Sequence, residues 1–320
     1  MSQSNSKSSK TVMVLGARGM LGHIITTVLE ESGHDVISVS RHGNFGKFPL
    51  SANLEDWDLL RSYLEKHRPD WVINAAGLLN EEVDRNKASA IIINSFLPQQ
   101  LSDAGAEIGY RTITVGSDCV FEGNRGSYTV ENNPDALSWY GRTKQLGELR
   151  NAKDLTIRTS IIGPEIDLGG RGLLLWLMSQ ENQVEGWTDA IWTGVTTLEL
   201  AKVINSLVSC HLQETGLWQL VPKTSITKFD LLHLMHTTYL NSKLTINAVP
   251  GLGHDRSLVN DRAESWPVPN YSEMLSELKA WTDTHQDLYR STVFELPRNL
   301  DDSLRLGQAR HTLGNEVETL

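Results

Sequence analysis

The stretch TVMVLGARGMLG (residues 11–22) decides the fold class of this chain. An apolar run ends at Gly16, and Gly19 and Gly22 follow at a spacing of three, directly before a segment with helical periodicity. Glycine lets a backbone approach a ligand closely, and the start of a helix presents free N–H groups to an anion. Three glycines alone are a weak signal, but in this strand–turn–helix context they predict a dinucleotide-binding loop.

Apolar runs alternate with helical segments outward from this loop. We expect strands at 11–16, 35–40, 69–77, 111–117 and 155–162, and helices at 20–33, 54–67, 89–109 (bent or interrupted near Pro98) and 136–152. The alternation predicts an α/β fold, a Rossmann-type doubly wound parallel sheet with helices on both faces. Ligands bind outside the carboxyl ends of such strands. One rim should therefore carry Gly16, Ser40–Arg41, Ala75–Gly77, Ser117 and Thr159.

The end of the second expected strand indicates which dinucleotide binds. An NAD site usually has Asp or Glu there to accept the ribose hydroxyls, whereas this chain has Ser40 and Arg41. A guanidinium can fork onto a 2′-phosphate, and Arg18 in the glycine loop would face the same group. The alternative is that Arg41 is an ordinary surface arginine. We favour NADPH over NADH.

The length of 320 residues suggests two lobes. Residues 11–165 are expected to form an NADP-binding Rossmann domain, and residues 166–320 a smaller C-terminal substrate-binding domain. Residues 191–212 include a helical segment that should return to the first domain. The polar residues 1–10 are expected to be a disordered tail.

Composition excludes several classes of function. A net charge of −10 argues against binding to nucleic acid or to a membrane surface, because both require a basic patch. No apolar run approaches the roughly 20 residues of a membrane span. The two cysteines, Cys119 and Cys210, lack metal-ligand spacing, so we expect no metal site and reduced thiols in a cytoplasmic protein.

Two Tyr-x-x-x-Lys pairs compete for a catalytic role, Tyr140–Lys144 and Tyr239–Lys243. Residues four apart share a helix face, so a lysine could promote proton donation by the phenol. Tyr239 lies far from the predicted rim, and we interpret its pair as a solvated helix end. Tyr140 follows the strand that ends at Ser117. We therefore predict that Ser117 and Tyr140 bind one carbonyl oxygen, with Tyr140 as the acid and Lys144 lowering its pKa.

Five stretches carry a resemblance to a known family: LGARGMLG, PDWVINAAG, GSDCVFEG, YGRTKQLGE and IRTSIIGPE. The chain resembles the RmlD family of dTDP-4-dehydrorhamnose reductases, in the extended short-chain dehydrogenase/reductase superfamily. The resemblance is specific from residue 11 to about 165 and thinner to about 240. It implies reduction of the 4-keto group of a nucleotide-activated deoxysugar, for the synthesis of bacterial polysaccharide or O-antigen precursors.

The resemblance also implies residue roles. Ser117 stands where the family has a catalytic Thr, Tyr140 and Lys144 match its Tyr and Lys, and Asp118 matches an aspartate beside the substrate. Trp192, in an expected loop, is a candidate for stacking on the substrate. The residues assigned to the cofactor are Gly16, Arg18, Gly19, Met20, Leu21, Gly22, Ser40, Arg41, Asn53, Leu54, Ala75, Ala76, Gly77, Tyr140, Lys144 and Thr159.

Departures from the family pattern leave the substrate open. Cys119 replaces the family's Tyr, and related dehydratases have Glu there, so loss of water is not expected. Ile161 stands where the family often has Trp, and Gly194–Val195 where it has Pro-Thr. An epimerase on the same scaffold and a non-catalytic NADP-binding regulatory subunit remain alternatives. A homodimer is the oligomer that we consider.

Overall fold

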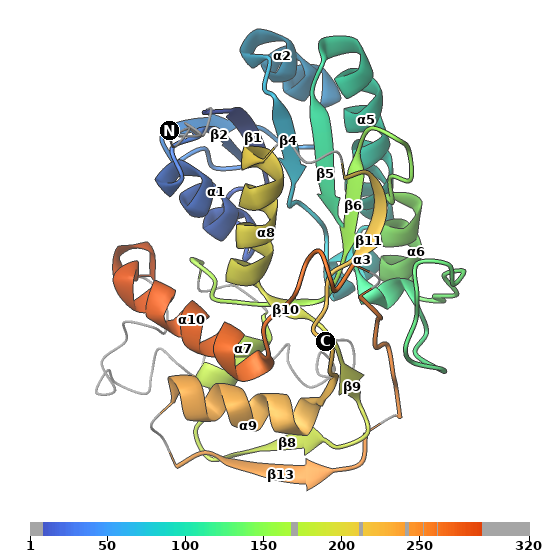
Figure 1. Ribbon diagram of the computed structural model, residues 1–320, viewed down its shortest axis with the longest axis vertical. Helices are drawn as coiled ribbons and strands as arrows, with labels where there is room; N and C mark the ends of the chain where they lie inside the picture. Colours follow the sequence, from blue (N-terminus) through green and yellow to red (C-terminus); the bar gives the residue numbers. More distant parts are fainter. Residues whose placement is uncertain are drawn as a thin grey trace, which may run out of the picture.

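The computed structural model describes residues 9–167, 172–210, 214–240, 243–251, 253–260 and 262–289. Residues 1–8 of the expected tail and residues 290–320 therefore lie outside the described residues. A seven-stranded sheet in the order β11-β6-β5-β4-β1-β2-β3 forms the centre, and all its pairings are parallel. Its strands are β1 (Thr11–Leu15), β2 (Asp35–Ser40), β3 (Phe48–Ser51), β4 (Trp71–Asn74), β5 (Arg111–Val115), β6 (Leu155–Arg158) and β11 (Gly216–Gln219). The predicted doubly wound α/β fold is confirmed (Figure 1).

Helices cover both faces of the sheet because side chains alternate along each strand. Val12 and Val14 of β1 belong to one core cluster, with residues of α1 (Gly22–Glu31) and α8 (Thr197–Ser209). Met13 and Leu15 belong to a second cluster on the other face. That cluster also contains buried residues of α2 (Trp57–His67) and α5 (Leu97–Ile108).

The helix expected at 89–109 is divided by a π-helical turn. It consists of α4 (Lys87–Ala90), η1 (Ile91–Phe96) and α5, and it follows the short helix α3 (Asn80–Arg85). The interruption precedes Pro98, which lies in the first turn of α5, where its missing N–H costs nothing. Asn94 of η1 accepts a hydrogen bond from the Leu78 amide at 2.9 Å, which fixes this turn beside the rim.

The helix expected at 136–152 is shorter in the structure, because α6 spans Trp139–Leu146. The Ser138 hydroxyl caps it by accepting from the Gly141 amide at 3.1 Å. At its other end, a Cβ on Gly147 would lie 2.0 Å from the Asn94 carbonyl oxygen. Only glycine therefore permits this close approach between α6 and η1.

The remaining elements form a smaller lobe beyond the carboxyl edge of the sheet, drawn below it in Figure 1. It contains three two-stranded sheets, β10–β7, β12–β9 and β13–β8. Their bounds are Ile161–Ile162 (β7), Gln183–Trp187 (β8), Ile191–Trp192 (β9), Val195–Thr196 (β10), Ile226–Thr227 (β12) and Thr245–Val249 (β13). The helices are α7 (Leu173–Met178), α9 (Lys228–Tyr239), α10 (Tyr271–Thr284) and the short 3-10 segment η3 (Gln286–Tyr289).

The chain crosses back to the central sheet between the two halves of this lobe. Helix α8 packs against α1, and β11 then pairs with β6 as the edge strand. The sequence interpretation had ended the sheet near residue 165, whereas residues 216–219 extend it by one strand. A single short strand of this kind has no periodicity long enough to distinguish it in the sequence. Among the described residues, no helix is both long and apolar enough to cross a membrane.

Candidate active site

The carboxyl ends of the parallel strands meet at one edge of the sheet, as the sequence predicted. Beyond this edge lies a pocket shared by the Rossmann part and the smaller lobe. Its lining includes the predicted residues Gly19, Met20, Leu21, Ala75, Ala76, Gly77, Ser117, Asp118, Tyr140, Lys144, Thr159 and Trp192. The predicted residues Gly16, Arg18, Gly22, Ser40, Arg41, Asn53 and Leu54 lie outside this lining.

The glycine loop forms a pocket wall made largely of backbone. Gly16 has φ of +76°, and a Cβ there would lie 2.9 Å from the backbone of Ala76. A Cβ on Gly22 would lie 2.0 Å from the Gly16 carbonyl oxygen. His23 Nδ1 lies 2.9 Å from the Gly19 carbonyl and holds the loop from behind. A tight backbone wall at the start of α1 suits the pyrophosphate of a dinucleotide.

The two arginines predicted to bind the 2′-phosphate both have carboxylate partners. Arg18 Nη2 lies 2.6 Å from Asp167 Oδ1, and the exposed Arg41 Nη2 lies 3.8 Å from Glu82 Oε1. The Ser40 hydroxyl accepts a hydrogen bond from the Gly43 amide at 3.0 Å, which orders the turn after β2. Arg41 is free to leave its partner, because an exposed pair at this distance contributes little.

Ser117 and Tyr140 come from consecutive elements that meet at the pocket. Ser117 follows β5 and caps the 3-10 turn η2 (Asp118–Val120), where its Oγ accepts from the Cys119 amide at 3.0 Å. Tyr140 lies in the first turn of α6. The side chains of Ser117 and Tyr140 both line the pocket.

Burial has the largest effect on the pKa values of Tyr140 and Lys144. It raises the pKa of Tyr140, and the neighbouring Cys119 and Asp118 add to the increase. Lys144 donates from Nζ to the Val115 carbonyl at 2.7 Å, and burial lowers the pKa of Lys144 to about 8. Burial therefore has the largest effect on the pKa of Tyr140 in the chain by itself. A decrease in this pKa caused by Lys144 stays a prediction.

The other candidate pair lies away from the pocket. Tyr239 is the last residue of α9, and its ring packs against the main core cluster, while Lys243 is exposed beyond the helix. Burial raises the pKa of Tyr239. The prediction that this pair does not belong to the site agrees with its position, but a solvated helix end was the wrong description of the tyrosine.

Trp192 lies in strand β9 rather than in a loop. Its Nε1 donates to Ser160 Oγ at 2.9 Å, and it packs beside Tyr271 with ring centroids 5.7 Å apart. Because the side chain belongs to the buried core, only part of it reaches the pocket. Stacking of its ring on a substrate stays a prediction. Trp187, at the end of β8, is less buried and also lines the pocket.

Sequence reasoning missed three basic residues that the smaller lobe places in the pocket. These are Lys228 at the start of α9, and His254 and Arg256 on the segment after β13. No local pattern distinguishes them, since their position depends on how the elements of the smaller lobe pack together. Among the described residues, no group of three or more His, Cys, Asp or Glu side chains could hold a metal ion.

This combination of fold and site defines a class of protein. A doubly wound sheet, a glycine loop after the first strand, and Ser, Tyr and Lys gathered at the carboxyl edge define the extended short-chain dehydrogenase/reductase superfamily. Residues 10–293 match the family model described as the RmlD substrate binding domain, and the chain belongs to that family. The resemblance inferred from the sequence is thus confirmed.

Relatives with printed functions cover parts of the chain. A dTDP-4-dehydrorhamnose reductase of Streptomyces griseus is 32% identical over 138 residues, which are 42% of this chain and 43% of that protein. The methionine adenosyltransferase 2 subunit beta of Rattus norvegicus is 28% identical over 141 residues, 44% of this chain and 42% of that one. The chain thus spans less than half the length of these relatives.

Solved structures match over most of their length. A hypothetical dTDP-4-dehydrorhamnose reductase from Sulfolobus tokodaii has a TM-score of 0.70 at 25% identity, covering 82% of this chain and 96% of that one. The Bacillus anthracis dTDP-4-dehydrorhamnose reductase, solved in complex with NADP, has a TM-score of 0.73 at 20% identity, covering 86% and 100%. At 20% identity, the similarity to the Bacillus anthracis structure shows a shared fold.

Proposed function

We propose that this protein is an NADPH-dependent reductase of the 4-keto group of a nucleotide-activated deoxysugar. In this proposal it works in the cytoplasm, as a homodimer, in the synthesis of bacterial polysaccharide or O-antigen precursors. The observation that carries the proposal is that Ser117, Tyr140 and Lys144 line the same pocket as the glycine loop. A reductase needs a dinucleotide site and a proton donor within reach of one substrate.

The chain's own groups divide the work of binding and proton transfer. Bound NADPH supplies the hydride. The backbone of Gly19–Leu21 and Ala75–Gly77 holds the dinucleotide along the rim, and Lys144 is in position to contact its nicotinamide ribose. Ser117 and Tyr140 both present hydroxyls to the ketone oxygen, and Tyr140 donates the proton as negative charge develops there.

The proton affinities suit this division. Because burial raises the pKa of Tyr140, its phenol is protonated at neutral pH and is a donor before reaction. Lys144, with a pKa of about 8, is still mostly protonated at pH 7. Its ammonium contributes positive charge on the same side of the pocket, which favours the developing oxyanion.

Cys119 favours reduction over dehydration. An elimination needs an acid that can give a proton to the departing hydroxyl. Burial raises the pKa of the Cys119 thiol to about 11, so it is a poor acid at neutral pH. An epimerase on this scaffold remains distinguishable, because it would form product without net loss of NADPH.

The relatedness to a methionine adenosyltransferase subunit supports a second candidate, a non-catalytic NADP-binding regulatory subunit. The two candidates differ in what they do with a nucleotide sugar. We would supply a panel of nucleotide 4-keto sugars and follow NADPH absorbance and product. The reductase should oxidise one NADPH per sugar and form a 4-hydroxy product. Tight NADPH binding without turnover on any sugar, together with a co-purifying enzyme, would favour the regulatory subunit.

A further inference from the structure

The smaller lobe contributes two strongly basic side chains to the pocket, Lys228 and Arg256. Lys228 is the first residue of α9, and Arg256 follows Asp255, whose amide donates to the Gly123 carbonyl at 2.8 Å. Both residues line the pocket. They belong to different segments of the smaller lobe, the start of α9 and the segment after β13, so the packing of that lobe brings them to one pocket.

Neither cation has a carboxylate partner at ion-pair distance. Among the described residues, no Asp or Glu oxygen lies within 4.0 Å of Lys228 Nζ or of the Arg256 guanidinium. The Nε of Arg256 is buried and has no hydrogen-bond partner there. By contrast, the fully buried Arg158 is paired with Glu148 at 2.7 Å. Arg256 is only half-buried as a whole, but a buried guanidinium nitrogen without a partner is costly to maintain, which points to a ligand.

Among the described residues, Asp118 is the carboxyl group that interacts electrostatically with both cations, and its single charge does not neutralise both. Against the larger effect of burial, the charge of Asp118 acts to raise the pKa of Lys228. The charges of Arg256 and Lys228 in turn act to lower the pKa of Asp118. Burial opposes ionisation of both Asp118 and Lys228, raising the pKa of Asp118 and lowering that of Lys228 to about 8. Even with Asp118 ionised and Lys228 protonated, this part of the pocket keeps an excess positive charge.

The two cations also lie close to the reacting groups. Arg256 Nη1 is 3.9 Å from Cys119 Sγ, and Cys119 lines the pocket together with Ser117 and Tyr140. Lys228 Nζ lies 5.7 Å from the centroid of the Trp187 ring, which restricts where the ammonium can move. An anion held here would be bound in the same pocket as Ser117 and Tyr140.

We propose that Lys228 and Arg256 form a subsite for an anionic group of the substrate, held through phosphoryl or carboxylate oxygens. The proposal deepens the reductase function and rests on it for the identity of the substrate. A guanidinium can bind two oxygens with its fork, and the lysine adds a point charge. The oxygens come either from the diphosphate of the nucleotide or from a carboxylate on the sugar ring.

The test measures binding of anions by the whole chain, loaded with NADP+ and without turnover. The probes are dTDP, UDP and D-glucuronate, with thymidine as the probe that lacks an anionic group, each titrated by calorimetry. The variants are Arg256→Gln, Lys228→Gln and Arg256→Lys. Lys223→Gln removes an exposed charge near the start of α9 and serves as the matched control. Thermal unfolding and NADPH affinity should be unchanged in every variant.

If the diphosphate occupies the subsite, we expect both Gln variants to bind dTDP and UDP at least tenfold more weakly than the unaltered protein does. Their affinity for thymidine should be unchanged. If the sugar carboxylate occupies it, only D-glucuronate binding should fall by that factor. Arg256→Lys should recover part of the loss. Equal affinities in the unaltered protein and both Gln variants would overturn the subsite, as would no binding of any anion. Anion binding without NADPH oxidation on any sugar would instead overturn the reductase function.

Discussion

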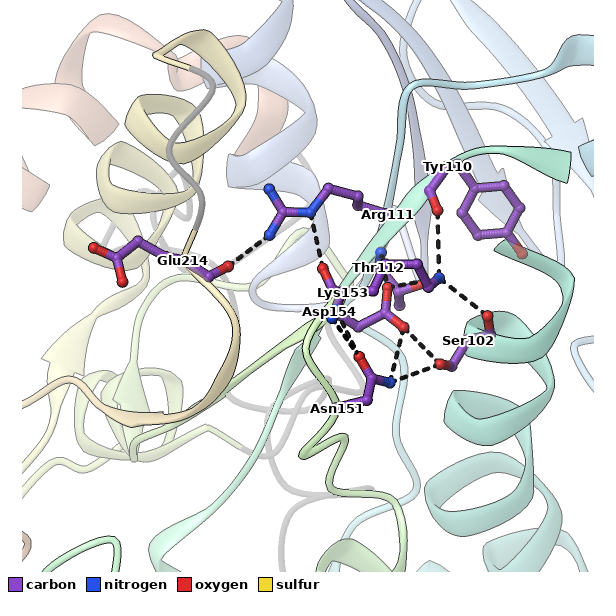
Figure 2. Close-up of polar contacts among 8 residues, drawn as sticks. All are labelled: Ser102, Tyr110, Arg111, Thr112, Asn151, Lys153, Asp154 and Glu214. Carbon is purple, nitrogen blue, oxygen red and sulfur yellow. Dashed lines mark hydrogen bonds and ion pairs between the residues drawn. The ribbon is translucent and has the colours of Figure 1, made fainter. Parts of the chain in front are cut away.

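Charged side chains lie at both edges of the central sheet, but among the described residues those at the amino edge are paired with other groups of the chain and two at the carboxyl edge have no carboxylate partner. Figure 2 shows the amino edge, where side chains from α5, β5 and the segments before β6 and β11 converge. At the carboxyl edge, Lys228 and Arg256 face a pocket without a carboxylate at ion-pair distance among the described residues. The charged groups Asp154 and Lys153 at the amino edge are paired with each other, whereas the two cations at the carboxyl edge are the groups that we propose bind a ligand.

Asp154 is the centre of the amino edge and is fully buried. Its Oδ1 accepts from the Thr112 amide at 2.8 Å and pairs with Lys153 at 2.9 Å. Its Oδ2 accepts from Ser102 at 2.5 Å and from Asn151 at 3.1 Å. With four partners, this carboxylate connects β5, α5 and the entry to β6, and it has no remaining capacity to bind a substrate.

Arg111 extends the same network to the edge strand. Its Nε donates to the Lys153 carbonyl at 2.8 Å, and its Nη2 donates to the Glu214 carbonyl at 2.6 Å, just before β11 (Figure 2). Its guanidinium also lies 4.5 Å from the Trp71 ring centroid. A charged side chain whose partners all belong to the chain contributes to the stability of the fold. A charged side chain in a pocket without such partners indicates a binding site.

The largest effect should come from Tyr140→Phe, at the carboxyl edge. This change removes the proton donor and keeps the ring, so we expect turnover to fall about a thousandfold, within the range of general acid catalysis. NADPH affinity should change little. Tyr239→Phe is the matched control and should leave turnover within about twofold. Steady-state kinetics would show that the wrong tyrosine was chosen if Tyr239→Phe were the inactive variant.

The next largest effect tests the amino edge. Asp154→Ala leaves the Thr112 amide and Lys153 without their carboxylate, and we expect a loss of about 3–4 kcal/mol in the free energy of unfolding. Lys153 is 32% exposed and can be rehydrated, which keeps the loss near the low end for a broken buried pair. Asp154→Asn keeps the shape and should cost less.

Urea unfolding measures this loss, and kinetics measure the activity of the folded variant. Turnover per folded molecule should equal that of the unaltered protein, because Asp154 lies at the edge opposite the pocket. A folded Asp154→Asn protein with strongly reduced turnover would show that the amino edge also takes part in function. This result would contradict the assignment of a purely stabilising role to the amino edge.

His23 lies at the carboxyl edge, but both of its ring nitrogens have partners within the chain, whereas Nε of Arg256 has no hydrogen-bond partner among the described residues. Burial lowers the pKa of His23 to about 4, while Nε2 lies 2.8 Å from the Tyr289 hydroxyl. Because the unfolded chain binds a proton near pH 6.5 and the folded chain only near pH 4, stability should fall as the pH drops through this window. The difference corresponds to about 3 kcal/mol at most.

Urea unfolding between pH 7 and pH 4 tests this assignment. His23→Gln should flatten the fall in stability with decreasing pH, because glutamine does not titrate. The exposed His42→Gln is the control and should keep the slope of the unaltered protein. An equal slope in His23→Gln would show that other groups cause the pH dependence.

The smallest effect is expected at Arg41, on the rim outside the pocket lining. Arg41→Ala should weaken NADPH binding about tenfold and change NADH binding little, because only NADPH carries the 2′-phosphate. The side chain is 67% exposed, so solvent and salt should hold the effect near tenfold. Arg61→Ala, on α2, is the control. Equal affinity of the unaltered protein for both cofactors would contradict the NADPH assignment.

Several helix and strand predictions from the sequence were close to the structure. The strand expected at 35–40 is β2 at Asp35–Ser40, and the helix expected at 54–67 is α2 at Trp57–His67. Both have patterns that are complete within a few residues. The interruption expected near Pro98 is the π-helical turn η1, which ends at Phe96. The early end of α6 at Leu146 was missed, because it depends on the close approach of Gly147 to the Asn94 backbone.

The sequence by itself determined the Rossmann fold class, the glycine loop and the position of Tyr140, rather than Tyr239, at the carboxyl edge, since each is a pattern of residues near one another along the chain. Tertiary structure alone decided the pairing of β11 with β6, the burial that raises the pKa of Tyr140, and the meeting of Lys228 with Arg256. Periodicity and spacing are local properties that a sequence displays directly. Burial and charge pairing depend on which distant segments pack together, and the folded chain settles them.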